Sequence, residues 1–147
     1  MKLYGIIFIK LQQMMNVLYY YIYLFYAKVI SDNQPHSRTI WALGFIFSLI
    51  INGLIDIPLA YFFNCYLSII QKVIIIIIVM TLFYLKYDRS GKGIRIVKKE
   101  KPKFFGSNTA SIILTILFFL ISISFYLFSV DVVTEILEKK KATTLPM

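Results

Sequence analysis

Residues 39–63 read TIWALGFIFSLIINGLIDIPLAYFF, residues 65–85 read CYLSIIQKVIIIIIVMTLFYL, and only Asn64 stands between them. Each stretch is long enough to cross the hydrocarbon core of a bilayer, which takes about 20 apolar residues in a helix. Aromatic residues stand near both ends of the first stretch, as they do at the headgroup levels of spanning helices. The pattern predicts a hairpin of two transmembrane helices with its tip at Asn64.

Each arm of this hairpin contains a charged residue, Asp56 in the first and Lys72 in the second, and each lies eight residues from Asn64. The symmetry places the acid and the base at about the same depth on neighbouring helices. A lone charge in the hydrocarbon region costs a few kcal/mol or more, so such residues usually have partners and are functional candidates. We predict an intramembrane ion pair that fixes the register of the hairpin. Two alternatives stay open: a proton relay or substrate counter-ion, and a pair that does not meet because Lys72 snorkels outward.

The composition excludes an ordinary soluble domain. Of the 147 residues, 59% are hydrophobic and 16% are charged, whereas soluble proteins contain about 25% charged residues. A third span is expected at residues 109–130, with Ser107 or Asn108 as its N-cap. Residues 131–147 are expected to form one or two helical turns and a frayed tail. The chain is thus predicted to be a single membrane domain, residues 1–147, with the all-α fold of an integral membrane helix bundle.

The segment of residues 11–30 is a poorer candidate for a span because it carries Gln12, Gln13 and Asn16. Its polar residues and tyrosines recur at intervals of four and three, and so share one helical face: Gln12, Asn16, Tyr19, Tyr23 and Tyr26. This favours an amphipathic helix in the membrane interface, with its tyrosine rings at the headgroup level. The chain would then have three transmembrane helices plus this N-terminal helix. The alternative is four transmembrane helices.

Half of the sixteen basic residues lie in the segment of residues 86–108. They are Lys86, Arg89, Lys92, Arg95, Lys98, Lys99, Lys101 and Lys103. By the positive-inside rule this basic segment is expected to be a cytoplasmic loop, which places the hairpin tip outside. The same eight residues are expected to contact anionic lipid. Nucleic acid is not expected as a partner, because the segment is short and tethered to the membrane at both ends.

Small and polar residues form two stripes on the expected spans. Gly44, Ser48, Asn52, Asp56 and Ala60 recur at every fourth residue of the first, and the third carries Ser111, Thr115, Ser122 and Ser129. Small residues let helices approach closely, and polar ones can hydrogen-bond across. We predict that the stripes are helix-packing seams that face one another.

No pattern typical of an enzyme is found in the sequence. There is no nucleophile set, paired-carboxylate motif or nucleotide loop, and the GKG of residues 91–93 lacks the residues of a phosphate loop. His36, the single histidine, is expected to be solvated in the loop of residues 31–38, and the single Cys65 excludes a cysteine cluster. We therefore expect no enzymatic activity, no cofactor and no metal site.

The stem YYYIYLFY at Tyr19–Tyr26, the SDNQPH turn, the apolar hairpin, the basic segment and the final span together resemble a group of small, uncharacterised bacterial membrane proteins. The resemblance implies this architecture and a bacterial inner (plasma) membrane, and it implies no activity. Immunity proteins against membrane-active toxins have a similar size and helix number, which is an analogy of fold alone.

Three functions are consistent with these observations. The first is a binding or protective protein, such as an immunity factor or an accessory subunit, that recognises a membrane-protein partner or a second copy of itself through the small-residue seams. The second is a small transporter or channel that uses membrane-buried Asp56. The third is a holin-like pore former, although holins usually carry their basic segment at the C-terminus. The sequence favours the first of these.

Overall fold

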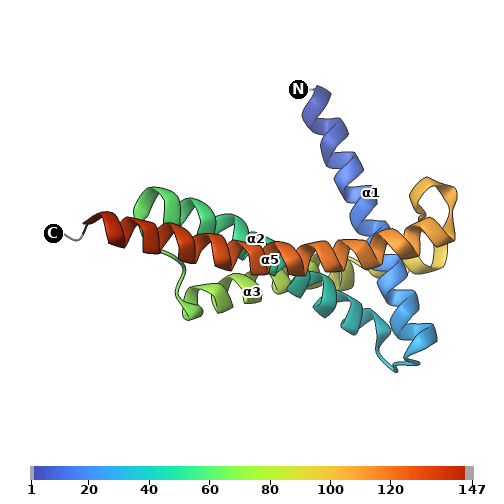
Figure 1. The fold of residues 1–147 in the computed structure, drawn as a ribbon. Helices are drawn as coiled ribbons and strands as arrows, with labels where there is room; N and C mark the ends of the chain where they lie inside the picture. Colours follow the sequence, from blue (N-terminus) through green and yellow to red (C-terminus); the bar gives the residue numbers. More distant parts are fainter. Residues whose placement is uncertain (1, 145–147) are drawn as a thin grey trace. The chain divides into compact units, whose positions relative to one another are not determined.

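The computed structural model describes residues 2–144, and no strand occurs among them (Figure 1). The helical elements are, in chain order, α1 (Lys2–Leu24), η1 (Phe25–Val29), α2 (Pro35–Phe63), α3 (Ile69–Tyr84), η2 (Leu85–Arg89), α4 (Lys92–Arg95), η3 (Ile96–Glu100), η4 (Phe104–Gly106) and α5 (Asn108–Thr144). Of the η elements, η1 to η3 are π-helical turns and η4 is a 3₁₀ turn. The predicted all-α fold class is confirmed.

Three of the described helices are long and apolar enough to cross a membrane. They cover Pro35–Phe63, Ile69–Arg89 and Asn108–Ala142. These are the three stretches that the sequence predicted as spans, and α1 is not among them. The fold is therefore consistent with an integral membrane protein.

The second helix of the hairpin begins later than predicted, at Ile69 rather than Cys65. Ser68 and Gln71 form a reciprocal cap: the Ser68 N–H donates to Gln71 Oε1 at 2.8 Å, and the Gln71 N–H donates to Ser68 Oγ at 3.3 Å. Such a capping box satisfies two backbone donors that the first turn of a helix leaves free. Cys65–Ser68 consequently form the connection between the helices.

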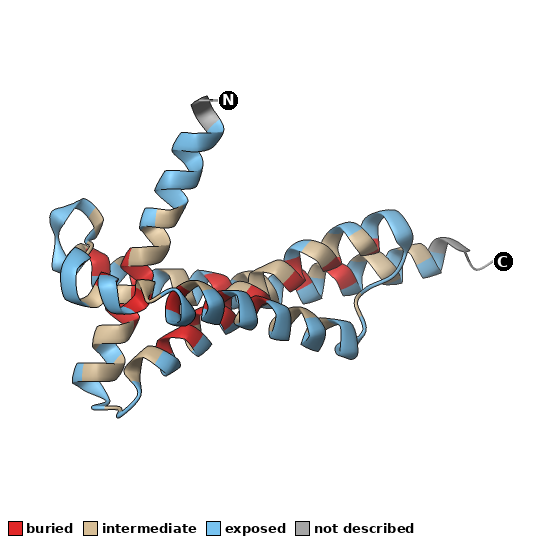
Figure 2. Cartoon of the chain, turned by 180° about the vertical axis from the view of Figure 1, so that it is seen from behind, coloured by how far each residue is buried: buried red, intermediate tan, exposed pale blue. Residues whose placement is uncertain are grey.

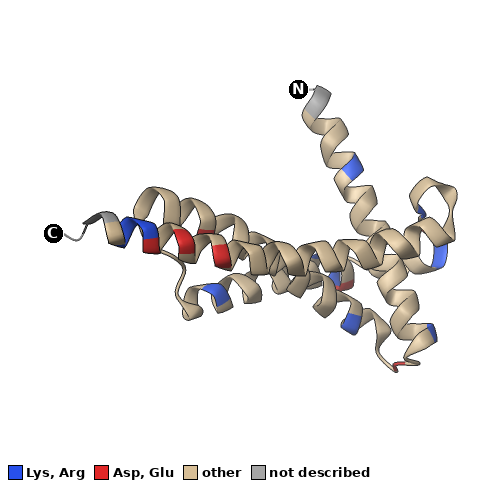
Figure 3. Cartoon of the chain, viewed as in Figure 1, with Lys and Arg blue, Asp and Glu red and all other residues tan. Residues whose placement is uncertain are grey.

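The prediction that only one or two helical turns follow residue 130 is wrong, because α5 continues as helix to Thr144. Lys139 pairs with Glu135 one turn earlier, at 2.5 Å between Nζ and Oε1, an arrangement that supports helices weakly. The end of α5 carries both acidic and basic side chains (Figure 3). Residues 145–147 of the predicted tail lie outside the described residues.

The basic segment of residues 86–108 is also more regular than the predicted loop. It contains three short helical elements, η2, α4 and η3, before the η4 turn. Gly91 ends the first of these turns in the left-handed region, at φ 65°, where glycine is favoured because it has no Cβ. The predicted N-cap of the following helix is Ser107, whose Oγ accepts from the Ala110 N–H at 3.3 Å.

The described chain divides into two compact units. One contains the residues up to Leu43 together with Leu82–Phe118, and the other contains Gly44–Thr81 together with the chain from Phe119 onward. Buried residues occur in both, whereas residues 4–11 of α1 are exposed (Figure 2).

The core of the first unit forms around the second half of α1. Tyr19 is fully buried there and stacks on Tyr87 of η2, with ring centroids 4.5 Å apart. Leu18, Leu43 and Ile96 are buried in the same unit. Tyr19, one of the tyrosines on the predicted polar face of residues 11–30, is therefore a core residue of this unit.

His36 is not a solvated loop residue, as the sequence predicted. It lies in the first turn of α2, and its Nδ1 is hydrogen-bonded to the Tyr19 hydroxyl at 2.9 Å. The Tyr23 ring packs beside it, with centroids 4.4 Å apart. Burial, and then the nearby Asp88, raise the pKa of the Tyr19 phenol well above its ordinary value. The phenol thus remains protonated and is available as a donor to His36.

Candidate functional site in the α2–α3 hairpin

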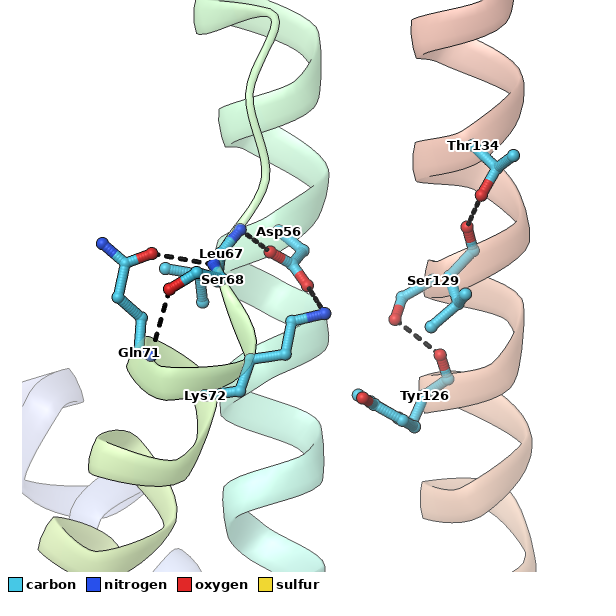
Figure 4. A network of polar contacts seen from close by, with 9 residues as sticks. Asp56, Leu67, Ser68, Gln71, Lys72, Tyr126, Ser129 and Thr134 are labelled. Atoms are coloured by element: carbon cyan, nitrogen blue, oxygen red, sulfur yellow. Dashed lines mark hydrogen bonds and ion pairs between the residues drawn. The ribbon is translucent and has the colours of Figure 1, made fainter.

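Asp56 of α2 and Lys72 of α3 form an ion pair in the second unit, with Lys72 Nζ 2.7 Å from Asp56 Oδ2 (Figure 4). The Asp56 side chain is only 4% exposed and that of Lys72 is 22% exposed. The eight-residue symmetry about Asn64 therefore corresponds to direct contact between the two side chains. In so buried a setting each charge offsets much of the other's desolvation cost.

The second carboxylate oxygen of Asp56 is also occupied. Asp56 Oδ1 accepts the backbone N–H of Leu67 at 2.7 Å, in the connection that leads from Asn64 to α3. One carboxylate thus holds both the connection and the second helix against α2. This arrangement fixes the register of the hairpin, and it leaves neither oxygen of Asp56 without a protein partner.

Asn52 lies one turn before Asp56 on α2 and is almost fully buried, at 1% exposure. Its Oδ1 has no hydrogen-bond partner. A buried polar atom of this kind is uncommon in folded proteins and is usually satisfied by water, an ion or a ligand. Asn52 is therefore the group near the ion pair that has an open acceptor position.

All of the predicted packing residues on α2 and α5 are buried: Gly44, Ser48, Asn52, Asp56 and Ala60 on α2, and Ser111, Thr115, Ser122 and Ser129 on α5. The hydroxyls of Ser48, Thr115 and Ser129 bond within their own helices. Ser48, Thr115 and Ser129 donate to the carbonyls of Phe45, Ser111 and Tyr126, respectively, at 2.6–2.7 Å. These hydroxyls thus contribute small size rather than cross-helix hydrogen bonds.

The α5 stripe is divided between the two units. Ser111 and Thr115 belong to the first unit, and Ser122 and Ser129 belong to the second. Ser111 has a local role, because its Oγ accepts the N–H of Phe104 at 2.8 Å. The α2 stripe belongs to the second unit throughout.

α2 lies close to α5 at Gly53, which the sequence reasoning did not select. A Cβ at this position would lie 2.8 Å from Ser129 Oγ and 3.0 Å from Phe125 Cε1. On the α3 side, a Cβ at Gly44 would lie 3.0 Å from Met80 Cγ. Glycines permit both contacts because they lack a side chain. Gly53 directly follows Asn52, a member of the α2 stripe, in the sequence. This position was the available signal that Gly53 takes part in helix packing.

Lys140 is a second residue that the sequence reasoning missed. Its Nζ donates to the carbonyls of Ala60 and Tyr61 and to Asn64 Oδ1, the last at 2.6 Å. The last carbonyls of a helix have no partner within it, and a lysine is well suited to them by charge. Lys140 of α5 therefore caps the C-terminal end of α2. This gives a structural reason for one lysine of the basic cluster at residues 139–141.

The eight basic residues of the segment that follows α3 differ in their environment. Lys86 and Lys92 are partly buried, whereas the other six are exposed. Lys86 Nζ lies 3.7 Å from Met15 Sδ and 5.5 Å from the centre of the Tyr87 ring. The two lysines are therefore held against the protein, while the six other bases face outward.

Within the described residues, no group of three or more His, Cys, Asp or Glu side chains is placed to hold a metal ion. Cys65 is exposed in the hairpin connection. No protein-family model matches the chain, and comparisons with curated proteins and with solved structures give no significant match.

Proposed function

We propose that this chain is a non-enzymatic, multi-pass protein of the inner (plasma) membrane that acts by binding another membrane-embedded protein. An immunity-like protein or an accessory subunit acts in this way. The observation that carries the proposal is the state of Asp56, whose two carboxylate oxygens are both bound within the hairpin at 2.7 Å. An acid engaged in this way supports the fold of the hairpin, which favours a binding role over transport.

The surface for such a partner is not the small-residue seams that the sequence suggested. Those residues are buried within the chain. The apolar windows of α3 and α5 are only 11% and 17% buried, against 44% for α2. We propose that a partner, or a second copy of the chain, contacts the exposed face of α3, which includes Ile70, Ile74 and Ile77.

A cross-linking experiment tests this proposal. A photoreactive residue at Ile77, which is 59% exposed, is compared with one at Val79, which is 7% exposed. We expect a discrete adduct with one partner, or with a second copy, at Ile77 and not at Val79. Membrane potential is recorded in the same cells for the wild-type chain, Asp56→Asn and Asp56→Asn/Lys72→Met. A depolarisation that vanishes in both variants would overturn the binding proposal.

A small transporter or channel built around Asp56 is the second candidate. The open acceptor position of Asn52, one turn from Asp56, favours it, because intramembrane polar groups often mark ion or proton pathways. Asn52→Leu discriminates between the two functions. Loss of an ion flux in this variant, at unchanged abundance in the membrane, would support transport; a binding protein would show no flux in either form.

Cys65 provides a direct test of the proposed topology, in which the basic segment is cytoplasmic and the hairpin tip lies outside. It is the single cysteine of the chain and is exposed. We expect a membrane-impermeant maleimide to label Cys65 in intact cells. A reporter chain, Cys65→Ser/Ile94→Cys, carries its thiol at an exposed position of α4 and should be labelled only after permeabilisation. The reverse pattern would show the opposite orientation.

A further inference from the structure

Two of the eight basic residues, Lys86 and Lys92, stand apart from the other six. They are partly buried, and no carboxylate among the described residues forms an ion pair with either of them. The Ser90 side chain links the two: its Oγ donates to the Lys86 carbonyl and accepts the Lys92 N–H at 3.3 Å. The backbones of the two lysines are therefore joined in one local structure at the end of η2 and the start of α4.

The Lys86 ammonium group contacts two uncharged groups of the protein. Its Nζ is in contact with Met15 Sδ and lies over the Tyr87 ring, and neither group neutralises a positive charge. Burial is also the main cause that lowers the pKa of the Lys92 ammonium; Arg95 lowers it further, and Glu100 raises it. Glu100 forms no ion pair with either lysine among the described residues, and an anion from outside the chain would offset the desolvation cost of both ammonium groups.

Two buried polar atoms of the same unit lack a hydrogen-bond partner. Tyr87, the chain neighbour of Lys86, has a buried hydroxyl without a partner, and Asn16, the neighbour of Met15, has a buried Oδ1 without a partner. Asn16 Nδ2 is engaged with Glu100 Oε2 at 3.4 Å. Hydroxyl groups of a polar ligand, or water that it holds, can satisfy such atoms.

The position of Lys86 indicates the source of the anion. It follows directly after the apolar stretch of α3, and the candidate span Ile69–Arg89 includes it. Lysines at the ends of spanning helices extend to the headgroup layer. A phosphate group at this level is carried by a phospholipid. The exposed bases around the site add a diffuse attraction for the same membrane surface.

We propose that Lys86 and Lys92 form a specific site for the phosphodiester of an anionic phospholipid with a hydroxylated headgroup, and that the six exposed bases contribute only general attraction. The proposal goes beyond partner binding, because it requires no second protein. It assigns one bound lipid to a defined place in the first unit.

The test uses the full chain purified in a neutral detergent and measures its unfolding temperature against added lipid. The probes are short-chain phosphatidylglycerol, short-chain phosphatidylcholine and inorganic phosphate. Ligands that bind the folded state raise the unfolding temperature in proportion to their affinity. We expect phosphatidylglycerol to stabilise the wild-type chain and the other two probes to have little effect.

Matched variants locate the site. Lys86→Gln/Lys92→Gln removes two partly buried charges, and Lys98→Gln/Lys99→Gln removes two exposed charges from the same segment. A basic residue near an anionic surface is worth about fivefold in affinity, so we expect a loss of roughly 25-fold for the first pair. We expect the second pair to lose less than about fivefold, because exposed charges are well screened. Lys86→Arg/Lys92→Arg should retain binding.

Three results would overturn the proposal. Equal losses in the two glutamine pairs would leave only diffuse attraction, and equal stabilisation by phosphatidylcholine would exclude an anionic site. Stabilisation by inorganic phosphate as strong as that by phosphatidylglycerol would assign the site to a soluble anion. If the first pair does not fold, Lys92→Gln alone is measured against Lys98→Gln, with an expected loss of roughly fivefold.

Discussion

Asp56→Asn alone, or Lys72→Met alone, is expected to reduce the amount of folded protein in the membrane at least tenfold, and the two changes together are expected to restore most of it. The ion pair joins the two arms of the hairpin at 2.7 Å, with the Asp56 side chain 4% exposed. Removing one partner leaves a buried charge uncompensated, at a cost of about 3–5 kcal/mol. Replacing both partners removes the charges together and is often nearly neutral.

The measurement is the abundance of tagged protein in isolated membranes, followed by its unfolding temperature in detergent. The matched control is the exposed pair of Glu135 and Lys139, whose Oε1 and Nζ atoms are 2.5 Å apart. Glu135→Gln or Lys139→Met should leave the abundance nearly unchanged, as surface ion pairs contribute little. An equal loss of abundance in the single and double variants of the buried pair would contradict the pairing.

The Asp56→Asn substitution also distinguishes two roles of the Asp56 carboxylate. Its amide oxygen can still accept the Leu67 N–H, which Asp56 Oδ1 accepts at 2.7 Å in the wild-type chain. Restoration in the double variant would therefore show that the connection needs an acceptor at this position but not a charge. Asp56→Leu/Lys72→Met removes both, and we expect it to be less stable than Asp56→Asn/Lys72→Met by about 1–3 kcal/mol, the cost of a buried unpaired N–H.

The hairpin could be predicted from the sequence because its determinants are local and periodic. Asp56 and Lys72 are related by equal spacing from Asn64, and helix geometry converts that spacing into a common depth. The stripe at every fourth residue of α2 identified a buried face for the same reason. The cap formed by Ser68 and Gln71 also has a local signature, because S-x-x-Q before an apolar run is typical of a helix start, but the predicted span began at Cys65 and did not use it.

The contacts that depend on distant parts of the chain could not be predicted. In the sequence, Lys140 is one of three consecutive lysines at residues 139–141. Only the position of α5 against α2 makes it a donor to the carbonyls of Ala60 and Tyr61. Similarly, Tyr19 and His36 look like an interfacial ring and a loop histidine. They become core residues because η2 and α4 fold back over α1, with Tyr87 stacked on Tyr19.

For a related reason, the sequence could not show that Lys86 and Lys92 differ in burial from the other six bases. Eight bases in one segment predict a charged loop, and composition cannot tell which of them is held against α1. The order of the segment rests on Gly93, the last residue of the GKG at residues 91–93. In the structure Gly93 is buried and packs on Tyr19.

Gly93→Ala is therefore expected to destabilise the first unit by about 2–3 kcal/mol, within the range for overpacking a filled site. A Cβ at this position would lie 2.4 Å from Tyr19 Oη, 2.9 Å from Tyr19 Cζ and 3.0 Å from the Tyr87 carbonyl oxygen. Tyr19 has little freedom to move, because its ring is fully buried and stacked and its hydroxyl is bonded to His36. A loss of this size lowers the unfolding temperature of a chain of this length by about 5–10 °C.

The unfolding temperature in detergent measures the effect, and two further variants test its cause. Gly5→Ala makes the same change in α1 with nothing within 4 Å of the new Cβ, and it should stabilise slightly because alanine is the better helix former. In Gly93→Ala/Tyr19→Phe the closest clashing atom, Tyr19 Oη, is absent. This double variant should recover part of the loss, although the His36 bond is lost and the contact with the Tyr87 carbonyl remains. If Gly93→Ala is as harmless as Gly5→Ala, α4 is not packed against Tyr19, and the ordered basic segment that positions Lys86 and Lys92 would have no support.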